Sequence, residues 1–174
     1  MWNSRLSKGA LLAVLALALA ACSSSRINHR HPLLQKSAQA APPPARVYFI
    51  RPRTERYMGP ADNRLRVEAD RFPLMKLAKG EYTLIPMVPG EVWITVTNLT
   101  AWGPRNLMKE MTRSTRFRFR SGETYYLVFE PVDGEFRGVY FRVRPVDAFE
   151  ARELVPYARP VGLARRAPLP GALR

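Results

Sequence analysis

The segment EVWITVTN, at residues 91–98, decides the fold class of this chain. Every second position carries an aliphatic side chain, and these positions are Val92, Ile94 and Val96. The positions between them carry Trp93, Thr95 and Thr97. Successive side chains of a β-strand point to opposite faces, so this alternation predicts a strand with one buried and one exposed face.

Similar short runs surround this segment. They are rich in Val, Ile, Phe, Tyr and Thr, and each ends near Gly, Pro, Asn or Asp, as strands do. The predicted strands cover residues 46–52, 63–70, 72–77, 81–87, 91–98, 114–120, 124–132 and 137–146. Residues 121–123 and the pair Asp133-Gly134 predict hairpin connections. This pattern favours a mainly β fold, a small antiparallel two-sheet sandwich of the immunoglobulin-like or transthyretin-like kind, with a small barrel as the alternative.

Other parts of the chain show no strand pattern. Residues 99–113 contain a Gly-Pro pair and a brief helical spacing, which predict a loop with one turn of helix. Asp147 and Glu150 have the spacing of a capping box, which predicts a short C-terminal helix. Residues 156–174 mix Pro, Ala, Leu and Arg without a period and predict a basic, disordered tail. The sandwich domain is therefore placed at residues 46–155.

The first residues have the pattern of an export signal. Two basic residues, Arg5 and Lys8, precede an uncharged run of small and apolar residues, so residues 1–21 are predicted to be a signal peptide. The sequence LAAC, which ends at Cys22, resembles the bacterial lipobox. That resemblance implies cleavage between Ala21 and Cys22, followed by a lipid anchor on the Cys22 sulfur.

Two alternatives to a lipid anchor stay open. The apolar run could be a transmembrane helix, but about a dozen helical residues reach only ~18 Å, against a hydrocarbon core of ~30 Å. Cleavage by the ordinary signal peptidase would instead leave a free thiol at Cys22, the only cysteine of the chain. In either case the chain cannot form an internal disulfide or a cysteine pair.

Residues 22–45 are predicted to be a flexible tether. They lack an apolar period and end in three consecutive prolines, and a chain of this length spans on the order of 25 Å. The two histidines, His29 and His31, lie in this tether without other ligands nearby, so we predict no metal site. Ser23 follows the cysteine, and similarity to Gram-negative lipoproteins implies an outer-membrane location that faces the periplasm.

The net charge points to anionic partners. The chain carries 28 Lys and Arg against 14 Asp and Glu, and 26 against 14 without Arg5 and Lys8, which leaves a formal charge of +12. The predicted binding residues are a row of arginines on two strands, Arg116, Arg118, Arg120, Arg142 and Arg144. If the two strands pair, these guanidinium groups suit phosphate or carboxylate ligands. A solvated sheet face is the alternative, and export argues against a nucleic acid partner.

No catalytic apparatus or cofactor site is apparent in the sequence. Both histidines lie in the tether and Cys22 is reserved for lipid, while carboxylates fall at predicted turns, where solvation explains them. These carboxylates are Glu81, Glu91, Glu123, Asp133 and Glu135. Trp93 and Trp102 could form a platform for a sugar ring, but core packing is the favoured interpretation of Trp93. We therefore expect no enzyme, no cofactor and no metal.

Four short segments resemble the bacterial lipoprotein domain-of-unknown-function family 2846. They are RVYFIR at residues 46–51, the Pro-Gly pair at 89–90, GETYYL at 122–127 and the segment 146–154. The resemblance covers residues 45–155 and implies a lipobox joined to a small β-sandwich, with no enzymatic activity or cofactor. The chain departs from that family in its arginine-rich ends and in residues 99–113.

Two functional hypotheses follow from the sequence. The first is a membrane-anchored envelope lipoprotein that acts as a structural or interaction module. The second is a binding module for an anionic envelope ligand, such as lipopolysaccharide, phospholipid or peptidoglycan, or for another envelope protein. Convergence of the arginines with aromatic residues on one surface would favour the second hypothesis.

Overall fold

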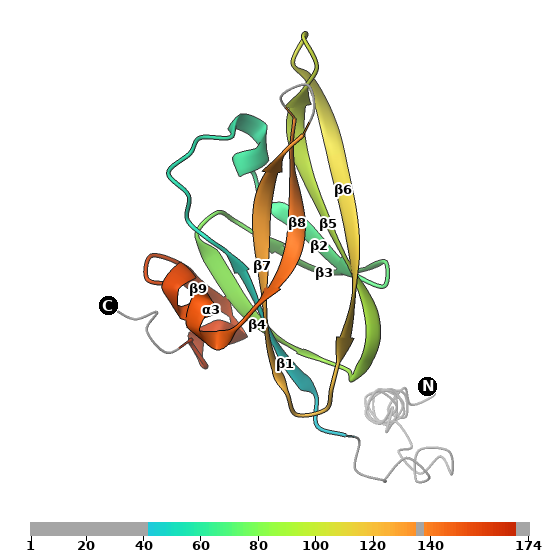
Figure 1. Cartoon of the computed structure of the whole chain (residues 1–174), viewed down its shortest axis with the longest axis vertical. Coiled ribbons are helices and arrows are strands. Elements are labelled where there is room, and N and C mark those ends of the chain that lie inside the picture. Colours follow the sequence, from blue (N-terminus) through green and yellow to red (C-terminus); the bar gives the residue numbers. More distant parts are fainter. Residues whose placement is uncertain (1–41, 135–137, 170–174) are drawn as a thin grey trace, which may run out of the picture. The chain divides into compact units, whose positions relative to one another are not determined.

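The structure is a computed structural model that describes residues 42–134 and 138–169 (Figure 1). These residues form a mainly β domain with two sheets and one short helix near its C-terminal end. The predicted signal peptide, Ala21, Cys22 and the tether up to residue 41 lie outside the described residues. Within the described ranges, none of the helices has the length and hydrophobicity needed to cross a membrane.

One sheet has five strands in the order β8-β7-β1-β4-β9. Their bounds are Val139–Val146 for β8, Thr124–Asp133 for β7, Ala45–Arg51 for β1, Glu81–Met87 for β4 and Arg159–Gly162 for β9. The pairs β1–β4 and β7–β8 are antiparallel, whereas β1–β7 and β4–β9 are parallel. The two-sheet prediction is therefore confirmed, but the prediction of purely antiparallel pairing is wrong for this sheet.

The other sheet has four antiparallel strands in the order β3-β2-β5-β6. Their bounds are Phe72–Leu77 for β3, Leu65–Ala69 for β2, Gly90–Trp102 for β5 and Leu107–Phe119 for β6. The predicted alternation of β5 is confirmed, since Val92, Ile94 and Val96 are buried. Phe119 is buried and Phe117 is partly buried on β6, whereas the arginines between and beyond them are exposed, as predicted.

The prediction of a loop at residues 99–113 is wrong. Strands β5 and β6 continue through this segment as one long hairpin, paired as far as Trp102 and Leu107. Its turn is closed by a hydrogen bond from the Asn106 N–H to the Gly103 carbonyl (3.1 Å), and both residues have a positive φ, of 50° and 75°. Leu107 and Met108 are exposed on this edge strand. A strand that buries few side chains has no apolar alternation, so the sequence pattern could not identify it.

The predicted hairpin at residues 121–123 is a connection between the two sheets. Strand β6 ends in the four-stranded sheet and β7 begins in the five-stranded sheet. Gly122 has a φ of 72°, and its N–H donates to the Pro43 carbonyl (3.1 Å). Turn residues reverse the chain but do not determine which strand becomes the next partner. The predicted pairing of the strands on either side of Asp133-Gly134 is confirmed, with Asp133 opposite Val139.

The main core lies between the two sheets. Each sheet contributes one face of aliphatic and aromatic side chains that are essentially excluded from solvent. These buried side chains include Ala45, Val47, Phe49, Leu65, Val67, Leu77, Val92, Ile94, Val96, Phe119, Leu127, Phe129, Phe141 and Val143.

A second core lies on the opposite face of the five-stranded sheet. Helix α3 (Ala148–Leu154), the 3-10 helix η3 (Leu163–Arg165) and the residues next to them cover that face. The buried side chains are Tyr48, Ile50, Tyr82, Leu84, Val128, Ala151, Val155, Ala158, Ala164 and Leu169. The prediction of helix α3 is confirmed, because the Asp147 side chain accepts a hydrogen bond from the Glu150 N–H (2.8 Å).

The prediction of a disordered tail is wrong for residues 156–169. Leu169 is 2% exposed, and burial of a leucine contributes about 2 kcal/mol to the free energy of unfolding. The physical reason lies in β1, where Tyr48 and Ile50 face away from the main core and need a cover of their own. Residues 170–174 lie outside the described residues.

Arg51, at the end of β1, is a charged side chain enclosed in the fold and is 1% exposed. Its guanidinium donates hydrogen bonds to the carbonyls of Asn63 (2.7 Å), Leu77 (3.0 Å) and Ala61 (2.8 Å). It also lies over the Phe141 ring, 5.0 Å from the centroid. Burial lowers the pKa of Arg51 to about 10, so the side chain stays charged at neutral pH. Arg51 thus fixes the 3-10 helix η1 (Gly59–Asp62) and the end of β3 against β1.

We expect Arg51→Met to lower the free energy of unfolding by about 3 kcal/mol, because three carbonyls lose their donor and two of these hydrogen bonds are fully buried. Urea unfolding followed by circular dichroism measures this change. Arg53→Met is the matched control, because Arg53 is exposed two residues further along the chain, and it should change stability by less than about 0.5 kcal/mol. Equal effects of the two substitutions would contradict a structural role for Arg51.

Candidate functional site

The predicted row of arginines is divided between the two sheets. Arg116 and Arg118 are exposed on β6 of the four-stranded sheet, and Arg120 is exposed directly after that strand. Arg142 and Arg144 lie on β8 of the five-stranded sheet. Strand β6 pairs with β5 and strand β8 pairs with β7, so β6 and β8 do not pair with each other. The five arginines therefore do not form the continuous row that the sequence predicted.

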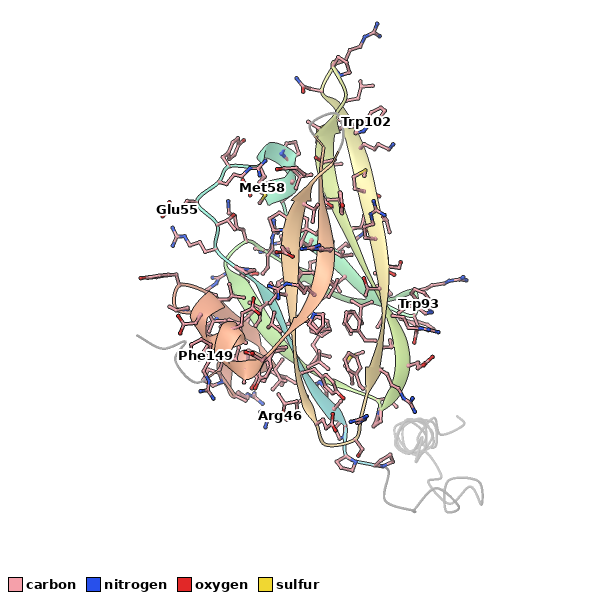
Figure 2. All side chains as sticks on the ribbon, viewed as in Figure 1. Arg46, Glu55, Met58, Trp93, Trp102 and Phe149 are labelled. Atoms are coloured by element: carbon pink, nitrogen blue, oxygen red, sulfur yellow. The ribbon has the colours of Figure 1, made fainter. Side chains whose placement is uncertain are left out.

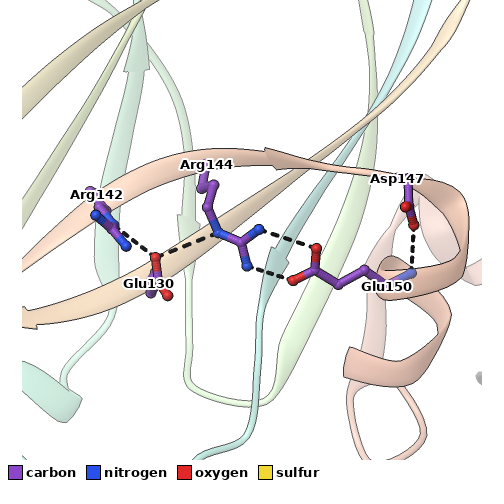
Figure 3. Close-up of polar contacts among 5 residues, drawn as sticks. All are labelled: Glu130, Arg142, Arg144, Asp147 and Glu150. Atoms are coloured by element: carbon purple, nitrogen blue, oxygen red, sulfur yellow. Dashed lines mark hydrogen bonds and ion pairs between the residues drawn. The ribbon is translucent and has the colours of Figure 1, made fainter.

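Arg142 and Arg144 are held by carboxylates (Figure 3). Arg142 Nε donates to Glu130 Oε2 (2.7 Å), and Arg144 Nε lies 3.6 Å from the same oxygen. Arg144 also makes a two-pronged contact with Glu150, with distances of 3.1 and 2.5 Å. The hydrogen bond from Arg144 holds the pKa of Glu150 below its ordinary value. These ion pairs connect β7, β8 and α3. The two arginines therefore have a structural role, and their charges are already paired.

Arg116, Arg118 and Arg120, which we call the β6 arginines because they lie at the end of β6 or directly after it, are paired less closely. Arg116 and Arg120 lie 3.7 Å from Glu91 and Glu123, at distances too long for strong hydrogen bonds. Arg118 makes no ion pair with any described residue. The β6 arginines are therefore available to bind a partner, whereas the guanidinium groups of Arg142 and Arg144 are already occupied by carboxylates.

The favoured interpretation of Trp93 as a core residue is wrong. Its side chain is 51% exposed on the outer face of the four-stranded sheet, and Arg116 lies 5.9 Å from its ring centroid. Trp102 lies near the turn of the β5–β6 hairpin, where Lys109 covers its ring at 4.5 Å. Figure 2 shows the two tryptophans well apart along this hairpin, so they form no shared platform.

A shallow hollow of about 470 Å³ lies beside Trp93 on this outer face. We call it the Trp93 hollow, and its lining residues are Glu68, Asp70, Arg71, Trp93, Thr95 and Ser114. The hydroxyls of Thr95 and Ser114 are hydrogen-bonded to each other (2.8 Å). Trp93 was a predicted candidate for stacking on a sugar ring, paired with Trp102, but the other residues of this hollow were not predicted.

Asp70 fixes the position of Trp93 in this hollow. Its carboxylate accepts a hydrogen bond from the backbone N–H of Trp93 (2.9 Å), and its own backbone N–H donates to the Trp93 carbonyl (2.9 Å). Asp70 and Arg71 form the tight turn between β2 and β3 and have φ values of 47° and 71°. Non-glycine residues seldom adopt this left-handed conformation. The turn therefore holds two charged side chains at the rim of the hollow.

The carboxylates predicted at solvated turns have different environments. Glu81 is only 6% exposed, so the prediction that it is solvated is wrong. Burial raises the pKa of Glu81, but hydrogen bonds from Arg159 and the Ala78 N–H outweigh that effect and lower it. Hydrogen bonds from Arg56 hold the pKa of Asp133 below its ordinary value. Among residues 42–134 and 138–169, no group of three or more His, Cys, Asp or Glu is placed to hold a metal ion.

We expect Arg144→Gln to raise the pKa of Glu150 toward its ordinary value, because the guanidinium partner is removed. A carboxyl with a lowered folded-state pKa stabilises the fold above its unfolded pKa, and that contribution is lost as the pH falls through the folded value. An NMR titration of the Glu150 carboxyl carbon measures the shift. Arg142→Gln is the control, because Arg142 contacts Glu130 instead. An unchanged Glu150 pKa in Arg144→Gln would contradict the pairing.

The chain was compared with known protein families, with curated protein sequences and with solved structures. None of the three comparisons finds a match.

Proposed function

We propose that this chain is an envelope lipoprotein that lipid on Cys22 anchors to the membrane, most simply the outer membrane with the domain facing the periplasm. Its β-domain acts as a structural or interaction module. The lipobox-like sequence at residues 19–22 and the basic and apolar residues before it support the anchor. The described domain begins with three exposed residues, 42–44, where the proposed tether would join it.

The β6 arginines carry the interaction part of the proposal. Three guanidinium groups recur at every second residue along the end of one edge strand and directly after it, and no described carboxylate binds any of them closely. Guanidinium groups bind phosphates and carboxylates through paired hydrogen bonds. An anionic envelope component is therefore the favoured partner, in the form of lipopolysaccharide, phospholipid headgroups or peptidoglycan, and an acidic face of another envelope protein is the alternative.

We also propose that the two sheets form a sandwich of the immunoglobulin-like or transthyretin-like kind. The segments that resemble the bacterial lipoprotein family 2846 fall at strand β1, at the start of β5 and β7, and along α3. An immunoglobulin-like or transthyretin-like sandwich is compatible with two sheets of five and four strands. Two parallel strand pairs distinguish the chain from a purely antiparallel version of either fold. We further propose a non-enzymatic role without a cofactor or a nucleic acid partner.

We expect Cys22→Ala to abolish acylation and release the chain from membranes, because the lipid would be lost while the β-domain begins about two dozen residues later. Metabolic labelling with a palmitate analogue and membrane fractionation after a high-salt wash measure both effects. Ser24→Ala is the matched control and should leave acylation unchanged. Retention of the Cys22→Ala variant in washed membranes would overturn the lipid anchor.

We expect the triple variant Arg116→Gln, Arg118→Gln and Arg120→Gln to weaken binding to anionic surfaces in a salt-dependent manner. The lipidated protein is inserted in phosphatidylcholine vesicles, and their attachment to phosphatidylglycerol or lipopolysaccharide vesicles and to purified peptidoglycan is measured. Each arginine near an anionic surface contributes about 1 kcal/mol, so the loss of three should weaken binding by about 3 kcal/mol, roughly hundredfold, at low salt.

The double variant Arg142→Gln and Arg144→Gln is the control, because it removes two positive charges, against three in the triple variant, from arginines that are already paired with Glu130 and Glu150. It should retain most of the binding. A loss in proportion to the number of charges that each variant removes would indicate that net charge alone governs attachment. Unchanged binding in the triple variant would remove the β6 arginines from the proposal.

A further inference from the structure

We infer that the Trp93 hollow binds a sugar ring of a neutral saccharide. This inference goes beyond the proposed function, because it concerns an uncharged ligand and does not depend on the lipid anchor. It rests on the strand register, the charges and the exposed indole of the outer face of the four-stranded sheet.

The strand register places the polar groups of the hollow in two adjacent rows. In one row Glu68 of β2, Thr95 of β5 and Ser114 of β6 lie opposite one another. In the next row Trp93 lies opposite Arg116, and Asp70 is hydrogen-bonded to the Trp93 backbone. Neighbouring strands are about 4.8 Å apart, and same-face residues along a strand about 6.8 Å apart. The hollow thus sets an aromatic surface beside hydrogen-bonding groups at the spacing of one small ring.

The charges of the hollow favour an uncharged polar ligand. Glu68 and Asp70 bring two carboxylates, while Arg71 in the lining and Arg116 against the indole bring two guanidinium groups. Their formal charges sum to zero. A hydroxyl-rich ring can donate hydrogen bonds to the carboxylates and accept them from the guanidinium groups, the two-sided pattern that a simple anion cannot use.

The exposed indole supplies the apolar part of such a site. Trp93 has a large aromatic side chain of the kind that usually buries most of its surface, yet it is half exposed. Binding sites for small polar ligands combine an aromatic surface with a few fixed polar groups. An indole that packs against the apolar face of a sugar ring, with Thr95 and Ser114 at its edge, has this composition.

The site is also held in place before a ligand arrives. Two hydrogen bonds to Asp70 fix the Trp93 backbone, and Arg116 rests against the ring. The left-handed turn carries Asp70 and Arg71 where glycine or asparagine would be less strained. Strained backbone is often retained where the side chain has a function. Replacement of Arg71 by glycine would relieve this backbone strain.

The test is calorimetric titration of the lipidated full chain, kept in a polyoxyethylene detergent so that no sugar headgroup competes. The probes are tetramers of β-1,4-linked N-acetylglucosamine and of α-1,4-linked glucose. We expect at least one tetramer to bind with a Kd of roughly 0.1–10 mM, and the Kd to change less than about twofold between low and high salt. Trp93→Ala should weaken binding at least about tenfold.

Two further variants separate binding from folding. Phe149→Ala removes another exposed aromatic side chain, on α3, and should leave the Kd unchanged. Arg71→Gly relieves the left-handed strain, so it should raise the melting temperature while weakening sugar binding several-fold. Trp93→Ala should also leave attachment to phosphatidylglycerol vesicles intact, which keeps this inference distinguishable from the role of the β6 arginines.

Four outcomes would overturn the inference. They are failure of both tetramers to bind, an unchanged Kd in Trp93→Ala, a Kd that weakens steeply with salt, and self-association of the chain that Trp93→Ala abolishes. The last result would make the exposed indole a contact between copies of the chain. A steep salt dependence would show that the charges of the hollow, and not stacking on the indole, control its binding.

Discussion

The structure depends on a central strand, β1, that is buried on both faces. Ala45, Val47 and Phe49 face the four-stranded sheet, whereas Tyr48 and Ile50 face the C-terminal segment. Arg51 ends the strand and binds three carbonyls of the neighbouring segments. A strand of this kind requires a cover on each side, because exposed aromatic and aliphatic side chains would lose their contribution to stability. The second sheet and the segment 147–169 provide these two covers.

The basic residues have three distinct environments, and the difference explains why net charge alone is a poor guide to function. Arg51 is enclosed and acts on backbone carbonyls. Arg142 and Arg144 are neutralised by Glu130 and Glu150 and connect strands to α3. The β6 arginines project from an edge strand, and charged side chains at such an edge also discourage pairing with other chains. Availability for a partner distinguishes this third group.

The sequence predicted the parts of the fold that have a local physical cause. The alternation in β5 and the cap at Asp147 are determined by residues close together in the chain, and both are confirmed. Strand β6 was missed in part because its side chains are mostly exposed, so burial left no period in its sequence. The β6–β7 connection and strand β9 depend on partners far away along the chain. Trp93 was considered from the sequence as a sugar platform, but the rest of the Trp93 hollow was not predicted for the same reason, because it combines residues of three strands and one turn.

The parallel pairing of β9 with β4 has a consequence for the order of folding. The strands that flank β1 in the sheet are distant in sequence, since β4 starts at Glu81 and β7 starts at Thr124, and β9 follows only at Arg159. Non-local strand pairing slows folding, because long loops must close before the contacts form. In a chain that emerges N-terminus first, the outer edge of β4 stays unpaired until nearly the whole domain is present. During that interval the exposed edge of β4 can pair with strands of other molecules. A chaperone that covers this edge until β9 is made would prevent such pairing.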